Sequence, residues 1–349
     1  MIDLVEKLYT NNTLRKHELI QLLRDIEAPT RNHLIKKAHA TRMHRYGDLV
    51  YMRGLIEFTN YCHQNCQYCG IRSGNPRAER YRLSLDEILD SCRIGSELGF
   101  RTFVLQGGED LYYNDERIVE ILERIKEQYP ESAITLSIGE KSRESYQKFY
   151  NAGADRYLLR HETASRHLYE RMHPDMTLDN RIKCLQNLKE IGFQVGTGFL
   201  VGLPGQTLED YVEDLIFLQE LKPHMVGIGP FIPHQHTPMS HEQGGSLTDV
   251  ITLLAIIRLL LPDVLLPATT ALGSIDPIGR EKGLKAGANV VMPNLSPTTA
   301  RAKYALYDGK ISTGDEAAEC RICIEDKIRN AGFTVDMSRG DHIDWRGLS

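Results

Sequence analysis

Short apolar runs alternate with amphipathic stretches through most of the chain. Eight such runs follow residue 50, at residues 51–58, 102–106, 133–137, 156–159, 194–200, 225–229, 265–269 and 289–292. The segments between them carry apolar residues at helical spacing, so the pattern predicts repeated βα units around a parallel sheet. Eight units in about 250 residues favour a (β/α)8 TIM barrel over an open sheet.

Glycines mark where the predicted helices end. Gly99, Gly153, Gly192 and Gly287 each lie between two apolar residues, just before a predicted strand. A glycine at this place is typical of a helix C-cap, which supports the count of βα units.

The ends of the chain do not follow the βα pattern. Residues 1–45 predict two or three helices, and after residue 310 a polar stretch precedes one helical segment at residues 323–330. We therefore divide the chain into an N-terminal helical extension (1–48), the barrel (49–310) and a short C-terminal appendage (311–349). The appendage follows the eighth unit, so we expect it to pack at most outside the barrel.

The composition excludes several classes of protein. The 349 residues are 41% hydrophobic, and 42 Lys+Arg against 47 Asp+Glu give a net charge of −5. The chain therefore lacks the basic character of a nucleic-acid binder. Its first residues are charged, and its longest apolar run is interrupted by Pro262 and Asp263. We expect a cytoplasmic protein with neither a nucleic acid nor a membrane as partner.

Three of the seven cysteines lie within eight positions. Cys62, Cys66 and Cys69 have the spacing C-x3-C-x2-C directly after the first predicted strand, where a parallel barrel places its active site. A structural zinc ion is the alternative, but it takes four ligands and only His63 stands nearby. Three thiolates on a four-iron cluster leave one iron open to a ligand. The motif therefore predicts a reactive 4Fe–4S cluster.

This loop resembles that of the radical S-adenosylmethionine (SAM) superfamily, in which an aromatic residue precedes the last cysteine as Tyr68 does here. The resemblance implies that the open iron binds the methionine moiety of SAM. It also implies that one electron then cleaves SAM to methionine and a 5′-deoxyadenosyl radical. The protein would position and shield these groups.

Two later loops resemble SAM-binding motifs of that superfamily. Gly107, Gly108 and Glu109 match the motif that holds the methionine amino group, although without the cysteines they would equally fit a plain turn. Residues 198–207 resemble the adenine-side motif, with Leu200 for the usual Ile. Gln206 stands near the usual Glu, and its role stays open.

The whole set of motifs resembles, over residues 55–310, one family of [FeFe]-hydrogenase maturases, the HydE family. The strings that carry this resemblance are YCHQNCQYCGIR, VLQGGEDLYY, TLSIGE, AGADRYLLRHETA, GFLVGLPGQT, VGIGPFIPH, LLPATTALG and GANVVMPN. It implies that Glu162 and Arg181 contact the SAM amino-acid moiety and that Ser137 lies beside the nucleoside. Arg160, His161 and Glu162 are adjacent after the fourth predicted strand, and a structural ion pair between Arg160 and Glu162 is an alternative role for them.

A substrate site is implied on the side opposite SAM. Arg160, Thr269 and Thr270 offer a cation and two hydroxyls for a substrate carboxylate, and Met225 and Met292 offer polarizable apolar walls, although a methionine is more often core. The resemblance implies a small organometallic or cysteine-derived substrate, an iron carrying CO and cyanide on a cysteine ligand. A tyrosine-lyase maturase would supply it, and a GTPase scaffold would receive the two-iron precursor of the H-cluster.

Cys320 and Cys323 form a C-x2-C pair, a candidate second metal site. Many relatives in the family carry a third cysteine where this chain has Ser312. Two thiolates alone do not hold a four-iron cluster, so a free pair, a disulfide, an adventitious metal site, a redox dithiol or a partial cluster all remain open. Cys92 and Cys184 lie in helical patterns and predict buried core positions. We expect a loop near the barrel mouth to contain His234, His236 and His241.

Two other functions compete with hydrogenase maturation. A radical SAM mutase or lyase of the methylornithine synthase type would hold an amino-acid carboxylate equally well with Arg160 and the two threonines. A non-catalytic iron–sulfur carrier would use the barrel only as a scaffold. Turnover of SAM separates an enzyme from a carrier.

Overall fold

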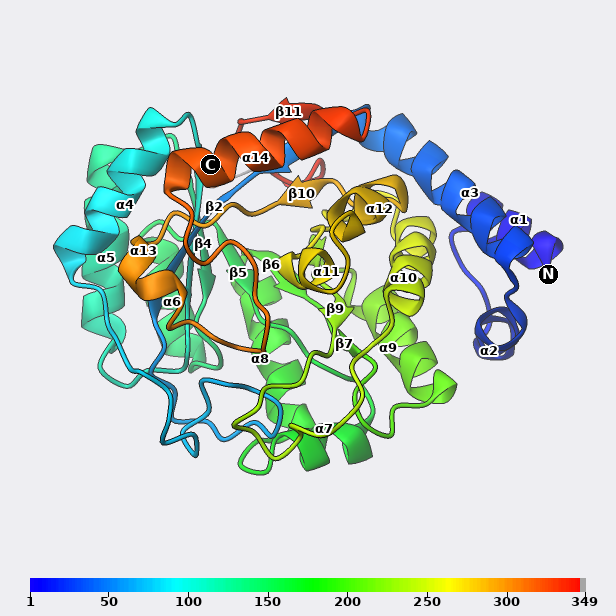
Figure 1. The fold of residues 1–349 in the computed structure, drawn as a ribbon, viewed down its shortest axis with the longest axis horizontal. Coiled ribbons are helices and arrows are strands. Elements are labelled where there is room, and N and C mark those ends of the chain that lie inside the picture. The colour runs from blue at the N-terminus through cyan, green and yellow to red at the C-terminus, as the bar shows by residue number, and fades with distance from the viewer. Residues whose placement is uncertain (346–349) are drawn as a thin grey trace.

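A parallel sheet of six strands, hydrogen-bonded in chain order, organises this computed structural model, which describes residues 1–345 (Figure 1). The strands are β2 (Gly54–Thr59), β3 (Thr102–Gly107), β4 (Ala133–Ser137), β5 (Arg156–Leu158), β6 (Gln194–Thr197) and β8 (Met225–Val226). All five pairings are parallel. Every residue of β2 is buried, as expected for a parallel strand covered on both faces.

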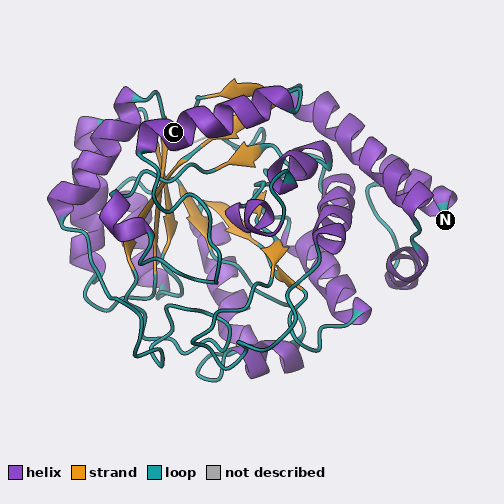
Figure 2. Cartoon of the chain, in the orientation of Figure 1, coloured by secondary structure: helices purple, strands orange, loops and turns teal. Residues whose placement is uncertain are grey.

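Helices connect successive strands and surround the sheet (Figure 2). They are α4 (Leu85–Glu97), α5 (Asp115–Gln128), α6 (Arg143–Asn151), α7 (Arg166–Met172), α8 (Leu178–Ile191) and α9 (Leu208–Leu221). Five of them are capped by a side chain that accepts a hydrogen bond from the backbone three residues on, those of Ser84, Asn114, Ser142, Thr177 and Thr207. The four glycines predicted as C-caps all have positive φ, from 91° to 114°, which confirms that prediction.

The remaining strands are short. β1 (Leu49–Met52) pairs in parallel with β10 (Val290–Val291) and β11 (Thr334–Asp336), and β7 (Leu200–Val201) pairs with β9 (Gly229–Pro230). Single parallel bridges join Met225 to Leu265, Pro267 to Val290 and Leu55 to Asn294. These bridges connect β8 through residues 265–267 to β10, and the residues after β10 to β2.

Three predicted strands differ in detail. Residues 51–58 divide at Arg53 into β1 and β2, because the two halves pair with different neighbours. Residues 194–200 divide at Gly198, whose φ is +154°. Residues 265–269 form only single bridges, since Pro267 has no N–H to donate to a ladder. The seventh predicted strand therefore lies between β8 and β10 but is reduced to these bridges.

Residues before β1 form α1 (Ile2–Asn11), α2 (Lys16–Asp25) and α3 (Ala28–Tyr46), and α3 packs along α10 (Leu247–Leu260). The rest of the carboxyl-terminal half forms α11 (Thr270–Ile275), α12 (Gly279–Lys285), α13 (Thr298–Arg301) and α14 (Ala317–Asn330). Within residues 1–345, no helix combines the length and the apolar character needed to cross a membrane.

The C-terminal segment takes a larger part in the fold than expected. β11 extends the β1 ladder, and residues 338–342 lie beneath the amino ends of the sheet strands. There Asp341 accepts a hydrogen bond from Gln194 at the start of β6 (2.7 Å) and pairs with Arg156 at the start of β5. Arg156 is fully buried and needs a counter-charge, which the tail supplies. The tail therefore contributes a strand and a counter-charge to the fold, which is more than the outside packing expected of it.

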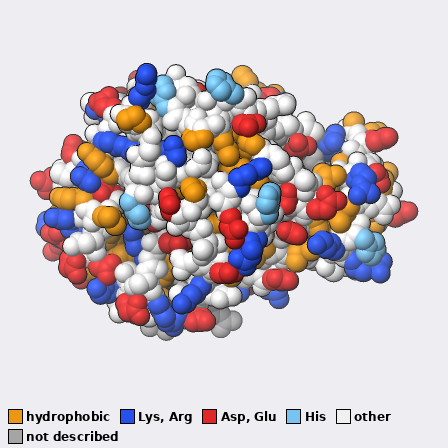
Figure 3. Space-filling model, turned by 90° about the horizontal axis from the view of Figure 1, so that it is seen from below, with side chains coloured by type: hydrophobic (Ala, Val, Ile, Leu, Met, Phe, Trp, Pro, Cys, Tyr) orange, Lys and Arg blue, Asp and Glu red, His pale blue; other side chains and the backbone are white. Residues whose placement is uncertain are grey.

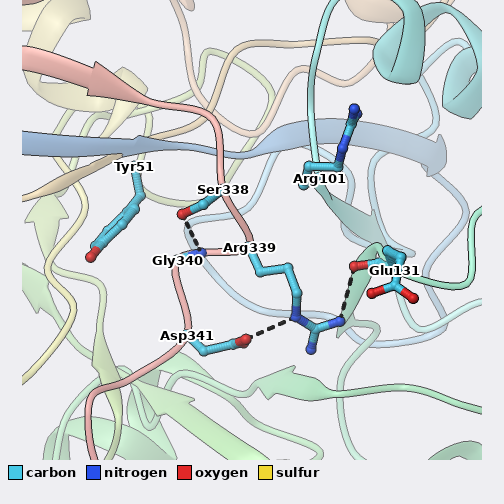
Figure 4. A pocket seen from close by; sticks show the side chains of 7 residues that line it. All are labelled: Tyr51, Arg101, Glu131, Ser338, Arg339, Gly340 and Asp341. Carbon is cyan, nitrogen blue, oxygen red and sulfur yellow. Dashed lines mark hydrogen bonds and ion pairs between the residues drawn. The ribbon is translucent and has the colours of Figure 1, made fainter.

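An open pocket of about 450 Å³ lies beside this tail (Figure 4). Arg339 spans it, donating to the Glu131 carbonyl at 3.2 Å and to Asp341 Oδ2 at 2.8 Å. Its lining residues are Tyr51, Arg101, Glu131, Ser338, Arg339, Gly340 and Asp341. This pocket lies at the amino ends of the strands, opposite the edge where the predicted site residues gather.

Candidate active site

The cysteine loop, residues 60–81, leaves the carboxyl end of β2. Cys62, Cys66 and Cys69 are free thiols and partly buried. Burial raises the pKa of the thiols of Cys62 and Cys66 and raises that of Cys69 to about 12. Thiols in this environment ionise readily only when a metal cation offsets the cost, so the loop is suited to a metal-bound group.

The histidine inside the motif is engaged elsewhere. His63 Nδ1 donates to the Glu109 carbonyl at 2.6 Å, and Nε2 accepts from Gln64 at 3.1 Å. Within residues 1–345, no three His, Cys, Asp or Glu side chains converge on a single metal ion. In a four-iron cluster each thiolate binds a different iron, and the three sulfurs of the loop fit that requirement as a donor set.

An aromatic assembly lies behind the loop. Tyr68 donates through its hydroxyl to His173 Nε2 at 3.0 Å, and His173 Nδ1 donates to the Tyr169 carbonyl at 2.9 Å. Because a carbonyl only accepts, this bond assigns the ring proton to Nδ1. Burial lowers the pKa of His173 to about 3, so its ring is neutral. No sequence motif singled out His173.

The glycines after β3 let the next loop touch the cysteine loop. A Cβ on Gly108 would lie 2.2 Å from the Tyr61 carbonyl oxygen and 2.8 Å from Cys62 Cβ, and one on Gly107 would lie 2.7 Å from Thr59 Cγ2. Only glycine allows such an approach without displacing a neighbour.

Glu109 is held by the surrounding backbone and side chains. Its Oε2 accepts from Gln64 Nε2 at 3.0 Å, and its Oε1 accepts from the Glu140 N–H at 3.2 Å. Ser137 ends the neighbouring strand β4, where it lies opposite Gln106 of β3. These residues therefore share the carboxyl edge of the sheet.

Arg160 and Glu162 follow β5 at the same edge. Arg160 Nη2 lies 3.0 Å from Glu162 Oε2, so the predicted alternative of an ion pair exists. Its geometry is poor: both atoms, and Arg160 Nε, are buried without a hydrogen-bond partner among residues 1–345. Glu162 also has a φ of +64°, which is unusual for a residue with a side chain. Buried polar atoms without hydrogen bonds, next to a strained backbone, point to a ligand.

Arg181 of α8 lies beneath this pair. Its Nε donates to Glu140 Oε1 at 2.6 Å, and its Nη1 donates to the Arg160 carbonyl. Arg181 thus supports the backbone that presents Arg160 and already has a carboxylate partner in Glu140.

A buried histidine, His161, lies between the two charged residues, and its partner Asp214 was not expected from the sequence. His161 Nδ1 lies 2.8 Å from Thr197 Oγ1, and its Nε2 lies 3.2 Å from Asp214 Oδ1, which also accepts from the Ala164 N–H. Burial lowers the pKa of His161 and raises that of Asp214, each well away from its ordinary value. Asp214 lies inside α9, where its sequence pattern resembles a solvated helix face.

The β7 turn explains the open role of Gln206. Its Oε1 accepts from the N–H groups of Gly202 (2.9 Å) and Leu203 (3.0 Å), and its Nε2 donates to the Leu200 carbonyl at 3.0 Å. Gln206 therefore shapes the turn that presents Leu200.

The predicted substrate residues fall into two groups. Thr269, just before α11, has a buried hydroxyl without a hydrogen-bond partner within the described chain, whereas the Thr270 hydroxyl accepts from Arg280 at 3.1 Å. Met225 and Met292 belong to one apolar cluster, and the sulfur of Met225 accepts from Arg53 at 3.0 Å.

Cys320 and Cys323 lie in different surroundings. Cys320 is buried in the hydrophobic core, whereas Cys323, one turn later on α14, is exposed. Cys92 and Cys184 are buried, which confirms their predicted core positions. His234 is buried beside Gly70 of the cysteine loop, in a loop near this edge as expected. Basic and acidic side chains are interspersed across the face that Figure 3 shows.

Comparison with known proteins agrees with this arrangement. The model of the Radical SAM superfamily matches residues 56–218. The chain is 46% identical over 314 residues to the [FeFe] hydrogenase maturase subunit HydE of Thermotoga maritima, spanning 90% of this chain and 88% of that protein. The chain belongs to the radical SAM superfamily. It is a radical SAM enzyme, and the family implies a 4Fe–4S cluster and SAM, which confirms the predicted family.

Other radical SAM proteins are also similar. The chain is 31% identical to 3-methylornithine synthase of Methanosarcina acetivorans, over 80% of this chain and 79% of that protein. The crystal structure of methylornithine synthase (PylB) superposes with a TM-score of 0.84 at 26% identity, over 95% of this chain and 97% of that one. The maturase HydG shares the fold, with a TM-score of 0.81 at 22% identity over 96% and 75% of the two chains.

Proposed function

We propose that Cys62, Cys66 and Cys69 hold a 4Fe–4S cluster whose fourth iron binds SAM. The proposal is supported by three free thiols in one loop and by a His63 ring whose two nitrogens are both hydrogen-bonded. When bound, cluster and SAM together supply the reductive cleavage that yields a 5′-deoxyadenosyl radical. A second cluster at Cys320 and Cys323 is not part of the proposal, because one of these thiols is buried in the core.

The SAM site is proposed along the carboxyl edge of the sheet. Glu162 Oε2 is buried without a hydrogen bond within residues 1–345 and would accept from the SAM ammonium. Arg181 would take the SAM carboxylate with a nitrogen not used by Glu140. The residues proposed to line the rest of this site are Tyr68, Gly107, Gly108, Glu109, Ser137 and Leu200.

The substrate site is proposed beside it. Arg160 would turn the nitrogens that lack hydrogen bonds within residues 1–345, and Thr269 its hydroxyl that lacks one there, to a substrate carboxylate, with Thr270 next to it. Met225 and Met292 would form the apolar wall. This combination suits a small cysteine-derived or organometallic anion.

We propose that the enzyme acts in assembly of the [FeFe]-hydrogenase H-cluster. The observation that carries this proposal is the 46% identity to HydE over 90% of the chain. The tyrosine-lyase maturase and the GTPase scaffold are its proposed partners. A radical SAM mutase acting on an amino acid is the second candidate, favoured by the TM-score of 0.84 to methylornithine synthase.

We also propose a closed barrel and a cytoplasmic location for the protein. The single bridges at Leu265, Pro267 and Asn294 support closure of the sheet into a (β/α)8 barrel at residues 49–310, with residues 1–48 and 311–349 as its extensions. Seven free cysteines support a reducing, cytoplasmic location.

Formation of 5′-deoxyadenosine tests the function. The reconstituted, reduced protein should cleave SAM, and its addition to a hydrogenase maturation assay lacking this component should restore hydrogenase activity. Turnover with a plain amino acid, without restored hydrogenase, would favour the mutase. Iron binding without SAM cleavage would show a carrier and contradict the proposal.

A further inference from the structure

The cysteine loop leaves and re-enters the fold at one point. Asn60, fully buried, donates through Nδ2 to the carbonyl groups of Glu79 (2.8 Å) and Lys303 (2.7 Å), and its Oδ1 accepts from the Tyr81 N–H at 2.8 Å. Thr59, the residue before Asn60, forms an antiparallel bridge with Arg82, the residue after Tyr81. The two ends of the loop are therefore fixed to each other.

Arg80 extends this closure into the loop. Its Nη1 donates to the carbonyl oxygens of Asn60 and Ile71 (2.7 Å), and its Nη2 donates to those of Arg72 (2.7 Å) and Asn75 (3.5 Å). Asn60 precedes the three cysteines and the other acceptors follow them. One guanidinium thus joins the segments on both sides of the thiols, which an ammonium with its point-like geometry cannot do.

The charge of Arg80 lies close to the cysteines along the chain. Its guanidinium binds the carbonyl of Asn60, two residues before Cys62, and that of Ile71, two residues after Cys69. Among residues 1–345, no ion pair of the structure includes Arg80, so no carboxylate there offsets its charge.

We propose that Arg80 is a positioning residue of the cluster site. Its hydrogen bonds join the segments before and after the three cysteines and so hold the loop that carries the sulfurs, and its uncompensated charge favours uptake of an electron by the cluster. The inference rests on the proposed function, because it concerns the cluster that function requires. A cluster bound by three thiolates is anionic, so a nearby cation makes its reduction easier.

The test compares Arg80→Met and Arg80→Lys with Arg77→Met. Arg77 lies in the same loop and is exposed, so its variant is a matched control. In the metal-free protein, amide hydrogen exchange of residues 60–81 should be about tenfold faster or more in Arg80→Met and unchanged in the control. After anaerobic reconstitution, the iron content should fall from about four per chain to below about one in Arg80→Met.

The reduction potential separates the two roles of Arg80. In Arg80→Lys, which keeps the charge, any cluster formed should titrate near the wild-type potential, while the residual cluster of Arg80→Met should shift to more negative values. Equal exchange, iron content and potential in Arg80→Met and Arg77→Met would overturn the proposal. Exchange accelerated throughout the chain would also overturn it, because the role would then be general stability.

Failure of the proposed function would look different. If the wild-type protein takes up no four-iron cluster, the cluster assignment is wrong. The exchange comparison in the metal-free protein still decides whether Arg80 orders the loop.

Discussion

The two ends of the parallel sheet carry the same kinds of charged side chain but differ in the partners of the terminal arginine nitrogens, although Nε lacks a hydrogen bond in both Arg156 and Arg160 within residues 1–345. At the amino ends, both terminal nitrogens of Arg156 donate, to Thr102 Oγ1 at 3.1 Å, to the Arg339 carbonyl at 2.6 Å and to Asp341. At the carboxyl ends, Arg160 and Glu162 face each other with buried atoms that lack hydrogen bonds within the described chain.

This difference separates stability from function along a single strand. Arg156 begins β5, and Arg160 follows two residues after its end. An unsatisfied buried polar group costs free energy, so one end of the sheet contributes stability and the other keeps binding capacity for a ligand. The tail supplies partners of Arg156 at the amino ends of the strands. No segment of residues 1–345 completes the hydrogen bonds of Arg160 and Glu162 at the carboxyl ends.

The largest expected effect is a loss of activity at the carboxyl ends of the strands. Cys66→Ala should abolish SAM cleavage, because a cluster held by two thiolates does not assemble stably. The measurement is 5′-deoxyadenosine formed after anaerobic reconstitution and reduction, with the exposed Cys323→Ala as control. If Cys66→Ala still formed this product, the assignment of the cluster site would be wrong.

The next largest effect is a loss of stability at the amino ends of the strands. Asp341→Asn should lower the free energy of unfolding by about 3 kcal/mol, because it leaves the buried guanidinium of Arg156 without a counter-charge. Urea unfolding measures this loss, and Asp336→Asn, on the partly buried strand β11, is a control. SAM affinity of the folded variant should match the wild type. A large change in affinity would contradict the separation of the two ends.

A smaller effect concerns ligand binding alone. Glu162→Gln should weaken SAM binding by about 1.5–3 kcal/mol, roughly ten- to hundredfold, because a charge-assisted hydrogen bond to the ammonium is lost. Calorimetric titration of the cluster-loaded protein measures it, with the exposed Glu170→Gln of α7 as control. Normal SAM affinity together with a lower melting temperature would show that the Arg160 pair is structural.

The stability contributed by Asp341 at the amino ends should depend on pH. Burial tends to raise the pKa of Asp341, but Arg156 and Arg339 lower it below its usual value. Its stabilisation is thus present above about pH 4, the pKa of an unfolded aspartate, and is lost as the pH falls through the lower folded pKa. The stability difference between wild type and Asp341→Asn should therefore shrink below about pH 4. A difference unchanged at about pH 3 would contradict this assignment.

The smallest effect is expected at the tail cysteines. Cys320→Ser with Cys323→Ser should leave SAM cleavage intact and the iron content at about four per chain. Iron analysis and product formation measure both. A loss of two or more irons together with lost activity would reveal a working second cluster in α14.

Local patterns allowed much of the fold and the cluster motif to be predicted. The buried run at residues 133–137 coincides with β4, and the three cysteines stand within one loop, so their common role is visible in the chain itself. The run at residues 265–269 shows the limit. Its apolar character predicts a strand, but Pro267 removes a donor and leaves only single bridges.

Long-range partners could not be predicted. Arg156 and Asp341 are 185 positions apart, and each alone resembles a surface charge. Arg80 is hidden for a different reason: it binds backbone carbonyl groups, which every residue carries and no sequence letter marks. His161 and Asp214 likewise meet only when β5 and α9 come together.

The ladder between β1 and β11 has a consequence for the order of folding during synthesis. It pairs Leu49 with Thr334 and Tyr51 with Asp336, so an early strand waits for a segment much later in the sequence to leave the ribosome. Until then Arg53 lacks the Gly340 carbonyl at 3.0 Å, and Arg156 lacks its counter-charge. A nascent chain, or one truncated at residue 333, carries an open strand edge and unpaired arginines. It is therefore exposed to aggregation and degradation until residues 334–341 have been translated.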